Sequence, residues 1–328
     1  MRVMVTGGNG FMGRHLVRQL RSEGVAVSAL VRSDAAAQAV LALGATPVLG
    51  DITDPQALRL ALREPTDCVF HAAADTSAWR GHAERQTRTN VEGTRTVLEQ
   101  ARAAGVRRVV HTSSVSAFGQ QSGVISETSP RLGAQSWINY ERSKALAEDL
   151  VSQAEAAGVI ETVILNPVHI LGPGDTRNWA RLFLLLDQNK LPGAPPGSGP
   201  FADVREVARA HVTAWRHAPN GASYVLGGAQ SSFLQLIQLI AAELGRQPPQ
   251  RAMPEALLRS YAWLLDLASR ITAREPSLTP QAASFTCHHL EVDGSKAVRE
   301  LDYRITPLAQ LVADTAGWLR SEGLLAPR

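Results

Sequence analysis

Met4-Val-Thr-Gly-Gly-Asn-Gly-Phe-Met-Gly13 decides how the rest of this chain is interpreted, because it sets spaced glycines between a strand and a helix. Apolar residues alternate at a strand period over Arg2–Thr6, and helical spacing follows over His15–Leu20. Glycines at such a turn let a pyrophosphate approach the main chain, and the helix N-terminus faces the anion. The residues expected to bind it are Gly7, Gly10, Phe11, Met12 and Gly13.

An ordinary tight turn is the alternative, since this glycine spacing alone is a weak signal. A second apolar run over Val25–Val31 lies where the second strand of a βαβ unit belongs. Two further strands are expected at Pro47–Gly50 and Asp67–His71, a helix from Asn90 to Ala104, and a fifth strand at Val106–His111. This alternation predicts an α/β fold with a parallel sheet.

Composition fits a globular protein with one large or two small domains: 328 residues, 45% hydrophobic and 19% charged. Lys and Arg exceed Asp and Glu by only 33 to 30, which gives no indication of nucleic acid. Cys68 and Cys287 are far apart, so a disulfide framework is excluded and a reducing compartment is indicated. No apolar stretch of signal-peptide length precedes the first strand, and we expect a cytoplasmic location.

The residues after the second and third strands bear on which dinucleotide binds. NAD-binding units place an acidic residue about 20 positions beyond the glycines, on the ribose 2′-hydroxyl. Arg32-Ser33 stands there instead, which suits a 2′-phosphate and favours NADP over NAD, the alternative being a solvated arginine. Asp51, followed by Ile52, is expected either to accept from the adenine amino group or to cap the helix Pro55–Leu62. After the fourth strand, room for this ligand is expected at Ala72, Ala73 and Ala74.

Tyr140-Glu-Arg-Ser-Lys144 is the clearest catalytic pattern, on a helix expected to reach about Ala157. Residues four apart share one helix face, so the phenol and the ammonium point into the same cleft. A nearby cation is expected to lower the tyrosine pKa from about 10 towards neutrality, as a general acid or base requires. Such pairs also occur by accident on surfaces, but Ser114 lies 26 residues upstream behind five strands.

These motifs, in this order, resemble the extended short-chain dehydrogenases/reductases of the NAD-dependent epimerase/dehydratase superfamily. The branch of dihydroflavonol 4-reductase and 3β-hydroxysteroid dehydrogenase is the most similar. The resemblance runs from Thr6 to Gly227 and implies a Rossmann-type doubly wound sheet with a smaller, mostly helical C-terminal substrate-binding region. The implied NADP-binding domain is 1–166 plus about 201–227, and the substrate region is about 167–200 plus 228–328.

By this resemblance, Tyr140 donates a proton to a substrate carbonyl, or removes one from an alcohol, while Lys144 tunes Tyr140 and holds the nicotinamide ribose. Ser114 hydrogen-bonds the reacting oxygen, with Ser113 as a competitor for that role. Asn90 supports Lys144 through water. The residues implied to border the nicotinamide are Pro167, Val168 and Ile170, and those implied near the substrate are Trp79, Ser116, Phe118, Trp137 and Trp179, each of which also fits a core position.

Three functions fit these residues. The first is an NADP(H)-dependent reductase of a ketone or aldehyde, and the second is a nucleotide-sugar epimerase or dehydratase using tightly bound NAD. Gly199-Pro200-Phe201 replaces the Arg-Asp-Phe/Tyr run of nucleotide-sugar enzymes and disfavours the second, although Arg177, Arg181 or Arg205 offers another phosphate ligand. The third is a non-catalytic NADP sensor, which the retained tyrosine and lysine disfavour.

The later part of the chain is expected to be helical, with helices over Phe233–Leu244 and Pro254–Ile271 and a last one ending at Leu319. Core packing is expected for Tyr261, Trp263 and Leu264, with a pocket-capping or surface-lying helix as the alternative. Charges within 254–271 argue against a membrane span. His288-His289 lacks a third ligand, so no metal site is expected. A homodimer through helices 94–104 and 140–157 is expected from relatives.

Overall fold

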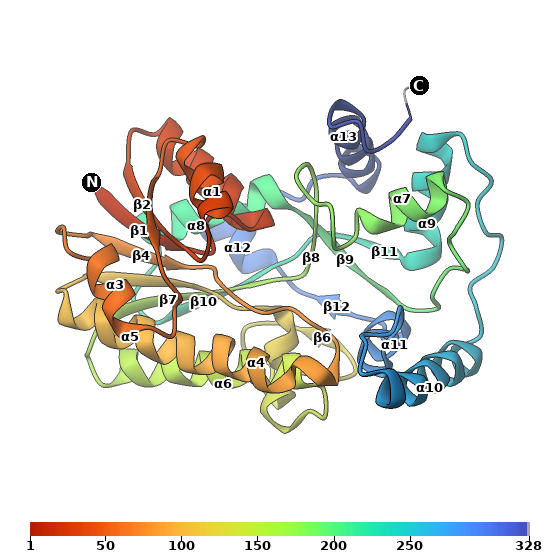
Figure 1. Ribbon diagram of the computed structural model, residues 1–328, viewed down its shortest axis with the longest axis horizontal. Helices are drawn as coiled ribbons and strands as arrows, with labels where there is room; N and C mark the ends of the chain where they lie inside the picture. The colour runs from red at the N-terminus through yellow and green to blue at the C-terminus, as the bar shows by residue number, and fades with distance from the viewer. Residues whose placement is uncertain (327–328) are drawn as a thin grey trace.

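The computed structural model describes residues 1–326, and seven strands within that range form one parallel sheet (Figure 1). The strands are β1 (Arg2–Thr6), β2 (Ala26–Val31), β3 (Thr46–Leu49), β4 (Cys68–His71), β5 (Arg108–Thr112), β7 (Glu161–Pro167) and β10 (Ala222–Leu226). Their order across the sheet is β10-β7-β5-β4-β1-β2-β3. All four residues of β4 are buried, as expected of a strand covered on both faces.

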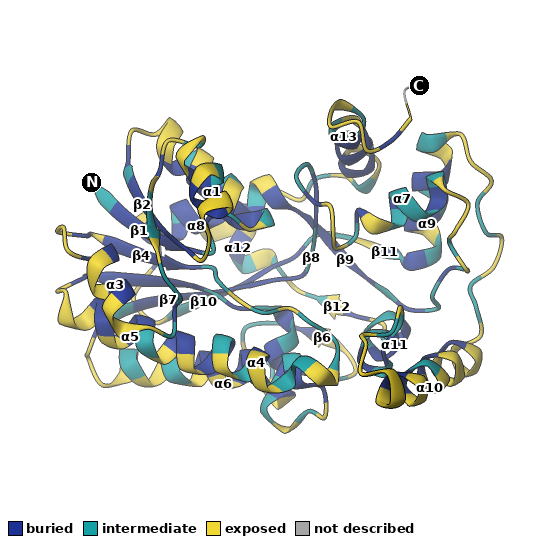
Figure 2. Ribbon diagram, viewed as in Figure 1, coloured by how far each residue is buried: buried dark blue, intermediate teal, exposed yellow. Residues whose placement is uncertain are grey.

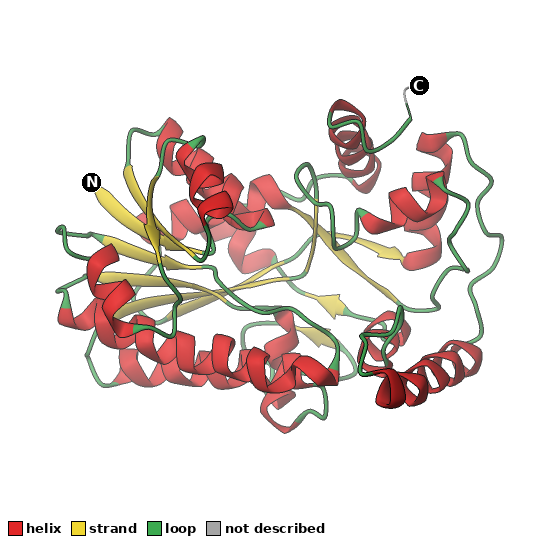
Figure 3. Cartoon of the chain, viewed as in Figure 1, coloured by secondary structure: helices red, strands yellow, loops and turns green. Residues whose placement is uncertain are grey.

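Helices cover both faces of this sheet, so the expected doubly wound fold is confirmed (Figure 3). One face carries α1 (Phe11–Ser22), α2 (Asp34–Leu41) and α8 (Val204–His217). The other carries α3 (Pro55–Ala61), α5 (Gly93–Ala103) and α6 (Asn139–Ala156). Each face has its own apolar core, so the sheet is a rigid support for whatever lies along its edges.

The chain reverses its direction across the sheet between β1 and β4, and this reversal positions the candidate site. From β1 the chain adds β2 and β3 on one side, and it then returns to add β4 on the other. The register aligns Thr6 with His71 and His71 with His111, so these strands end side by side. In open α/β sheets, a ligand binds outside the carboxyl ends of the strands at such a reversal.

A smaller region lies beside this edge, on the right of Figure 1, and is mostly helical as expected. Its three-stranded sheet consists of β8 (His169–Leu171), β9 (Ser198–Asp203) and β11 (Ala229–Ser232). Its helices are α7 (Arg181–Asp187), α9 (Phe233–Leu244), α10 (Glu255–Thr272), α11 (Pro280–Cys287) and α13 (Leu308–Ser321), whereas α12 (Ser295–Glu300) packs beside β10 of the main sheet. Residues 201–203 belong to β9 of this small sheet. The chain returns from there to the main sheet through α8, which packs on it, and β10, which is its edge strand.

Short elements complete the described chain. β6 (Val124–Ile125) pairs with β12 (Glu291–Val292), which ties the loop after β5 to the C-terminal region. The 3-10 turns are Arg80–His82, Val115–Phe118 and Leu132–Gln135.

The helix expected to begin at Asn90 begins earlier. The chain is helical from α4 (Ala83–Thr87) through a π-helical turn, Arg88–Glu92, into α5. An asparagine disfavours a helix interior when its side chain competes for the backbone. The Asn90 amide instead bonds Asp75 and Ser143 outside the helix, so the helix continues through it.

The prediction that the large residues of α10 pack in the core is also wrong. Tyr261, Trp263 and Leu264 are 45%, 59% and 57% exposed, and α10 is mostly yellow in Figure 2. The buried side of this helix instead carries Asp266, which accepts a hydrogen bond from the Arg80 Nε at 2.9 Å. This ion pair turns the apolar residues outward. Within residues 1–326, no helix has the length and apolar character needed to span a membrane.

Gly13→Ala tests the close packing of α1 on the β1 turn. A Cβ on Gly13 would lie 2.1 Å from the Gly7 carbonyl oxygen. Because two main-chain segments must separate to admit it, we expect the free energy of unfolding to fall by roughly 2 to 3 kcal/mol. Gly317→Ala, in α13 with open space around it, should instead raise that free energy by about 1 kcal/mol. Urea denaturation measures both, and a neutral Gly13→Ala would contradict the packing.

Candidate active site

The turn after β1 brings the main chain of two strands together. Gly7 has φ of +72°, and a Cβ there would lie 2.7 Å from the Ala73 nitrogen. Gly10 is the N-cap of α1, where no side chain caps the helix and no acidic residue lies in the first turn. The first N–H groups of a helix have no partner within it. This uncapped N-terminus beside bare backbone fits a nucleotide pyrophosphate.

Arg32 lies just beyond the end of β2, exposed to solvent. Within residues 1–326, its guanidinium is in no hydrogen bond or ion pair that would hold it elsewhere. The neighbouring Ser33 hydroxyl caps α2 by accepting from the Ala36 N–H at 3.3 Å, which leaves its own proton to donate. The exposed cation and hydroxyl fit the 2′-phosphate expected from the sequence.

Asp51 is not the cap of α3, which is one of its two expected roles. Asp54 is that cap, accepting from the Gln56 N–H at 2.8 Å. Asp51 accepts from the Thr53 N–H and hydroxyl at 2.9 and 2.8 Å. Burial opposes its ionisation, but these bonds and the nearby Arg32 hold the Asp51 pKa below its usual range. The adenine contact stays a prediction.

The backbone after β4 completes this side of the cleft. Thr6 holds it, since its carbonyl accepts from the Ala72 N–H at 3.3 Å and its hydroxyl from the Ala73 N–H at 3.2 Å. Ala72 and Ala73 are half-buried and Ala74 is exposed, so small side chains line the edge as expected. Ile52 packs against Gly93 in the core, which leaves only its main chain for a ligand.

Tyr140 and Lys144 lie one turn apart near the start of α6, beside the end of β5. The Tyr140 phenol is hydrogen-bonded to the Ser114 hydroxyl, whereas Ser113 lies beside the buried Glu148. The Lys144 ammonium is 3% exposed and donates to the Thr112 carbonyl oxygen at 2.7 Å. Of the two candidate serines, the structure therefore brings Ser114 to the phenol.

The electrostatics differ from the expected tyrosine activation. Burial raises the pKa of Tyr140, and the bond to Ser114 offsets only part of that rise. Burial lowers the pKa of Lys144 to about 8, against the attraction of Glu148. The expected lowering of the Tyr140 pKa is thus wrong for the protein without a ligand, because desolvation of the phenolate dominates and the ammonium is bound to Thr112.

Asn90 connects the cleft to α6. Its Oδ1 accepts from the Asp75 N–H at 2.7 Å, and its Nδ2 donates to the Asp75 carbonyl at 3.0 Å and to the Ser143 hydroxyl at 2.9 Å. Ser143 precedes Lys144, and no hydrogen bond joins Asn90 to Lys144 directly within residues 1–326. Asn90 therefore fixes the segment after β4 against α6, and its water relay stays a prediction.

The segment expected to border the nicotinamide leaves the sheet at the same edge. Pro167 ends β7, and the Val168 N–H donates to the Leu226 carbonyl at 3.2 Å. Ile170 then lies in β8, paired with Ala202 of β9. The segment thus crosses from the large sheet to the small one at the carboxyl edge.

The candidate substrate residues do not form one wall. Phe118 is fully buried in the core, with the Arg131 guanidinium over its ring, so its expected role at the substrate is wrong. Trp179 is half-buried and stacks on Phe233 with centroids 5.2 Å apart. Ser116 follows Ser114 and donates its N–H to that hydroxyl at 3.1 Å.

Of the two remaining tryptophans, Trp137 lines a hollow, and Trp79 is next in sequence to a residue that lines another. Trp79 has a buried indole N–H without a partner in the described structure and follows Ala78, which lines a hollow of about 480 Å³. Trp137 is 60% exposed and lines a second hollow of about 540 Å³. Neither hollow has a metal site, and residues 1–326 contain no cluster of three metal-ligating side chains.

Sequence patterns missed the residues that enclose the site from the C-terminal region. Phe285 of α11 meets the Tyr140 ring edge-on at 6.4 Å, and the Thr279 hydroxyl donates to the Ala78 carbonyl at 2.6 Å. Thr112, whose carbonyl accepts from Lys144, ends β5 just before Ser113 and Ser114. Its position next to the serines is the sequence signal that could have indicated a place in the site. The other two contacts join segments more than 140 residues apart, which no local pattern indicates.

Comparisons with known proteins cover most of the chain. The model of the NAD dependent epimerase/dehydratase family matches residues 3–227. The chain is 31% identical to sterol demethylase protein B of Methylococcus capsulatus, over 99% of this chain and all of that one. It is 37% identical to the 4-hydroxy-2-methyl-3-oxo-4-farnesyl-3,4-dihydroquinoline-1-oxide ketoreductase of Stigmatella aurantiaca, with 92% of each covered.

A solved structure extends the likeness in fold to the C-terminal region. UDP-glucose 4-epimerase from Thermotoga maritima, with UDP-glucose, superposes with a TM-score of 0.80 over 98% of this chain and 99% of that one. The identity is 20%, so this likeness concerns the fold alone.

The Tyr140 phenol should titrate above its ordinary range in the protein without nucleotide. We expect the ultraviolet phenolate signal that Tyr140→Phe removes to appear only above a pH of about 10, because burial penalises the phenolate. Ser114→Ala should move that signal to still higher pH, since the bond that lowers the pKa is gone. A Tyr140 phenolate signal near neutral pH would contradict this reading.

Proposed function

This chain belongs to the NAD dependent epimerase/dehydratase family, and from that premise we propose that it is an NADP(H)-dependent reductase of a ketone or aldehyde, or the dehydrogenase of the corresponding alcohol. The observation that carries the proposal is the bond between Tyr140 and Ser114, one helical turn from the buried Lys144. These groups lie at the sheet edge that the glycine turn also borders.

In carbonyl reduction, Ser114 and Tyr140 would act on the carbonyl oxygen, and the cofactor would act on the carbon. A nicotinamide, when bound, supplies or accepts a hydride at the reacting carbon. The Ser114 hydroxyl donates a hydrogen bond to the carbonyl oxygen, and Tyr140 gives its proton to that oxygen as the alcohol forms. In oxidation, the phenolate takes the proton back. Because burial raises the Tyr140 pKa, the phenol stays protonated at neutral pH, which favours reduction.

Two further features support a reductase over a nucleotide-sugar enzyme. The relative from Stigmatella aurantiaca is named a ketoreductase, and its substrate carries a farnesyl group, so an apolar carbonyl compound is the substrate class we propose. Gly199 stands where the alternative would place the arginine that binds the diphosphate.

A nucleotide-sugar epimerase with tightly bound NAD is the alternative. Arg205 is not available to a diphosphate, because Asp203 and Asp314 bind it at 2.6 and 2.5 Å. Arg181 is exposed and lines the hollow of about 480 Å³, where it could bind a diphosphate. This position favours the alternative. NAD that copurifies with the protein would support the epimerase, and exchangeable NADPH the reductase.

Cellular location and assembly are part of the same proposal. Cys68 and Cys287 are both buried free thiols, which supports a reducing cytoplasm. α5 and α6 pack against one another, and we propose that they form a homodimer interface, which sedimentation of the purified protein tests.

Tyr140→Phe is the direct test of the mechanism. Removing the proton donor should lower kcat roughly 100- to 10,000-fold, while NADPH binding stays nearly unchanged. Tyr261→Phe is the matched control, because that tyrosine is exposed on α10 and should turn over normally. Substantial activity in Tyr140→Phe would mean that another group carries the proton.

Arg32→Ala tests the choice of cofactor. We expect NADPH to bind roughly 10- to 100-fold more weakly to this variant, because charge-assisted hydrogen bonds to the 2′-phosphate are lost, with NADH binding unchanged. Arg63→Ala is the control, because Arg63 is exposed and its ion pair with Glu64 is a long one of 3.9 Å. Fluorescence titration measures both nucleotides, and an equal loss for each would contradict the 2′-phosphate role.

A further inference from the structure

Helix α10 turns its large aromatic residues and most of its large aliphatic ones to solvent, and it buries a carboxylate. The exposed apolar residues are Leu257 (55%), Tyr261 (45%), Trp263 (59%), Leu264 (57%), Leu267 (46%) and Ile271 (86%). The buried residues of the same helix are Leu258, Ala262, Asp266 and Ser269. A helix on the surface of a globular protein normally has the opposite arrangement.

The orientation of α10 is fixed by its polar side. The buried Asp266 carboxylate accepts from the Arg80 Nε at 2.9 Å, and the Ser269 hydroxyl donates to the Asp266 carbonyl at 2.7 Å. Rotating the apolar residues inward would separate the Asp266 carboxylate from Arg80 and break this ion pair. The outward apolar face is therefore a built feature of the fold.

The exposed residues form one continuous strip. At 3.6 residues per turn they span an arc of about 160°, with Tyr261 at one edge and Trp263 at the other. Leu257, Leu264 and Ile271 lie between these edges, along the whole helix. Aromatic residues at the boundaries of an aliphatic strip are the pattern of helices that lie in a membrane interface.

The charges around the strip are basic. Arg251 precedes α10 and Arg274 follows it, and neither is in an ion pair within residues 1–326. Arg270 is 58% exposed at the C-terminal end. Glu255 is paired with Arg259 at 2.6 Å, and the buried Asp266 is paired with Arg80 at 2.9 Å and with Arg270 at 3.4 Å, so neither acid is paired with Arg251 or Arg274.

These observations choose between occupants of the strip. A second copy packed helix against helix around a two-fold axis would bring the basic end at Arg251 against that at Arg274. The resulting repulsion disfavours a dimer through α10. Anionic lipid headgroups instead complement both basic ends, while the aliphatic strip reaches the acyl boundary.

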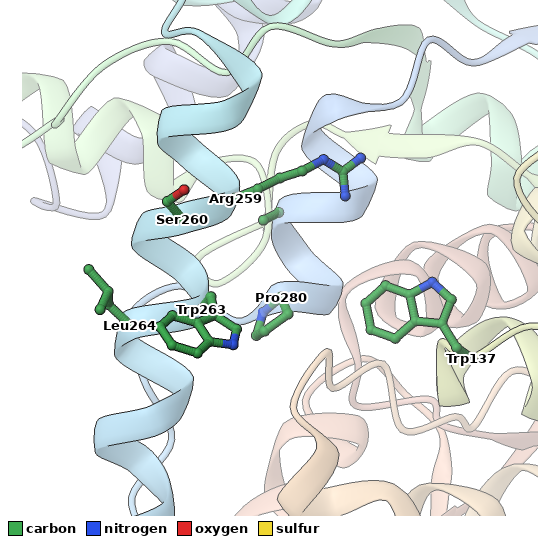
Figure 4. A pocket seen from close by; sticks show the side chains of 7 residues that line it. Trp137, Arg259, Ser260, Trp263, Leu264 and Pro280 are labelled. Carbon is green, nitrogen blue, oxygen red and sulfur yellow. The ribbon is translucent and has the colours of Figure 1, made fainter.

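We propose that α10 docks the protein on an anionic phospholipid surface, with this strip inserted at the headgroup level. The hollow of about 540 Å³ adjoins the strip, and Figure 4 shows Trp263 and Trp137 on opposite sides of Pro280 across it. Pro280 begins α11, whose Phe285 lies against Tyr140. The docked face thus adjoins the wall of the candidate active site. Docking itself does not rest on the proposed reaction.

Vesicle flotation tests the docking with the full chain. The probes are vesicles of phosphatidylcholine with and without phosphatidylglycerol, each at low and at physiological salt. The wild type should float with the anionic vesicles and much less with the neutral ones. Trp263→Gln with Leu264→Gln should weaken binding by about tenfold or more. Arg251→Gln and Arg274→Gln should each weaken it about fivefold, and only on anionic vesicles.

Leu60→Gln is the control for the loss of an exposed apolar side chain. Leu60 is 59% exposed on α3, away from the strip, and its replacement should leave vesicle binding unchanged. Circular dichroism and light scattering establish that each variant is folded and report its oligomeric state. Absence of flotation by the wild type overturns the proposal, as does flotation that the Trp263 and Leu264 changes leave intact. A dimer that those changes dissociate also overturns it, in favour of a second copy.

Discussion

The close approach of two main-chain segments at the carboxyl edge of the sheet is the constraint on which the rest of the site depends. A Cβ at Gly7 would lie 2.7 Å from the Ala73 nitrogen, and one at Gly13 would lie 2.1 Å from the Gly7 oxygen. Bare backbone on both sides leaves the N-terminus of α1 open to an anion. The Thr6 hydroxyl, bonded to the Ala73 N–H, holds the two segments in register.

Burial shifts the pKa values of the titratable side chains beside this edge more than their charged neighbours do. Lys144 is nearly inaccessible, and its charge adds to the burial that lowers the pKa of His71 to about 3. Burial likewise lowers the pKa of His211 to about 4, so these imidazoles are neutral at physiological pH. Lys144 is held beside the end of β5 by its hydrogen bond to the Thr112 carbonyl. A phenol in such surroundings holds its proton at neutral pH, because burial raises its pKa.

The C-terminal region contributes the other wall of the cleft and a surface of unusual polarity. Thr279 bonds the backbone of Ala78, and Arg80 bonds the buried Asp266 of α10, so the loop after β4 is tied to both α10 and α11. The same ion pair that closes this wall turns the apolar strip of α10 to solvent. Enclosure of the site and exposure of the strip therefore have one physical origin.

The sequence by itself determined the fold and the family, and it predicted the candidate catalytic residues. Glycine spacing, strand periodicity and the Tyr140–Lys144 interval are local patterns, because each depends on backbone geometry within a few residues. Tertiary structure alone decided that Asn90 lies inside a helix, that Phe118 is core and that Trp263 is exposed. It also decided that the Tyr140 pKa is raised. Burial and long-range partners set these properties. Asp266 and Arg80, for example, form an ion pair although 186 positions separate them in the sequence, and no local pattern spans such a separation.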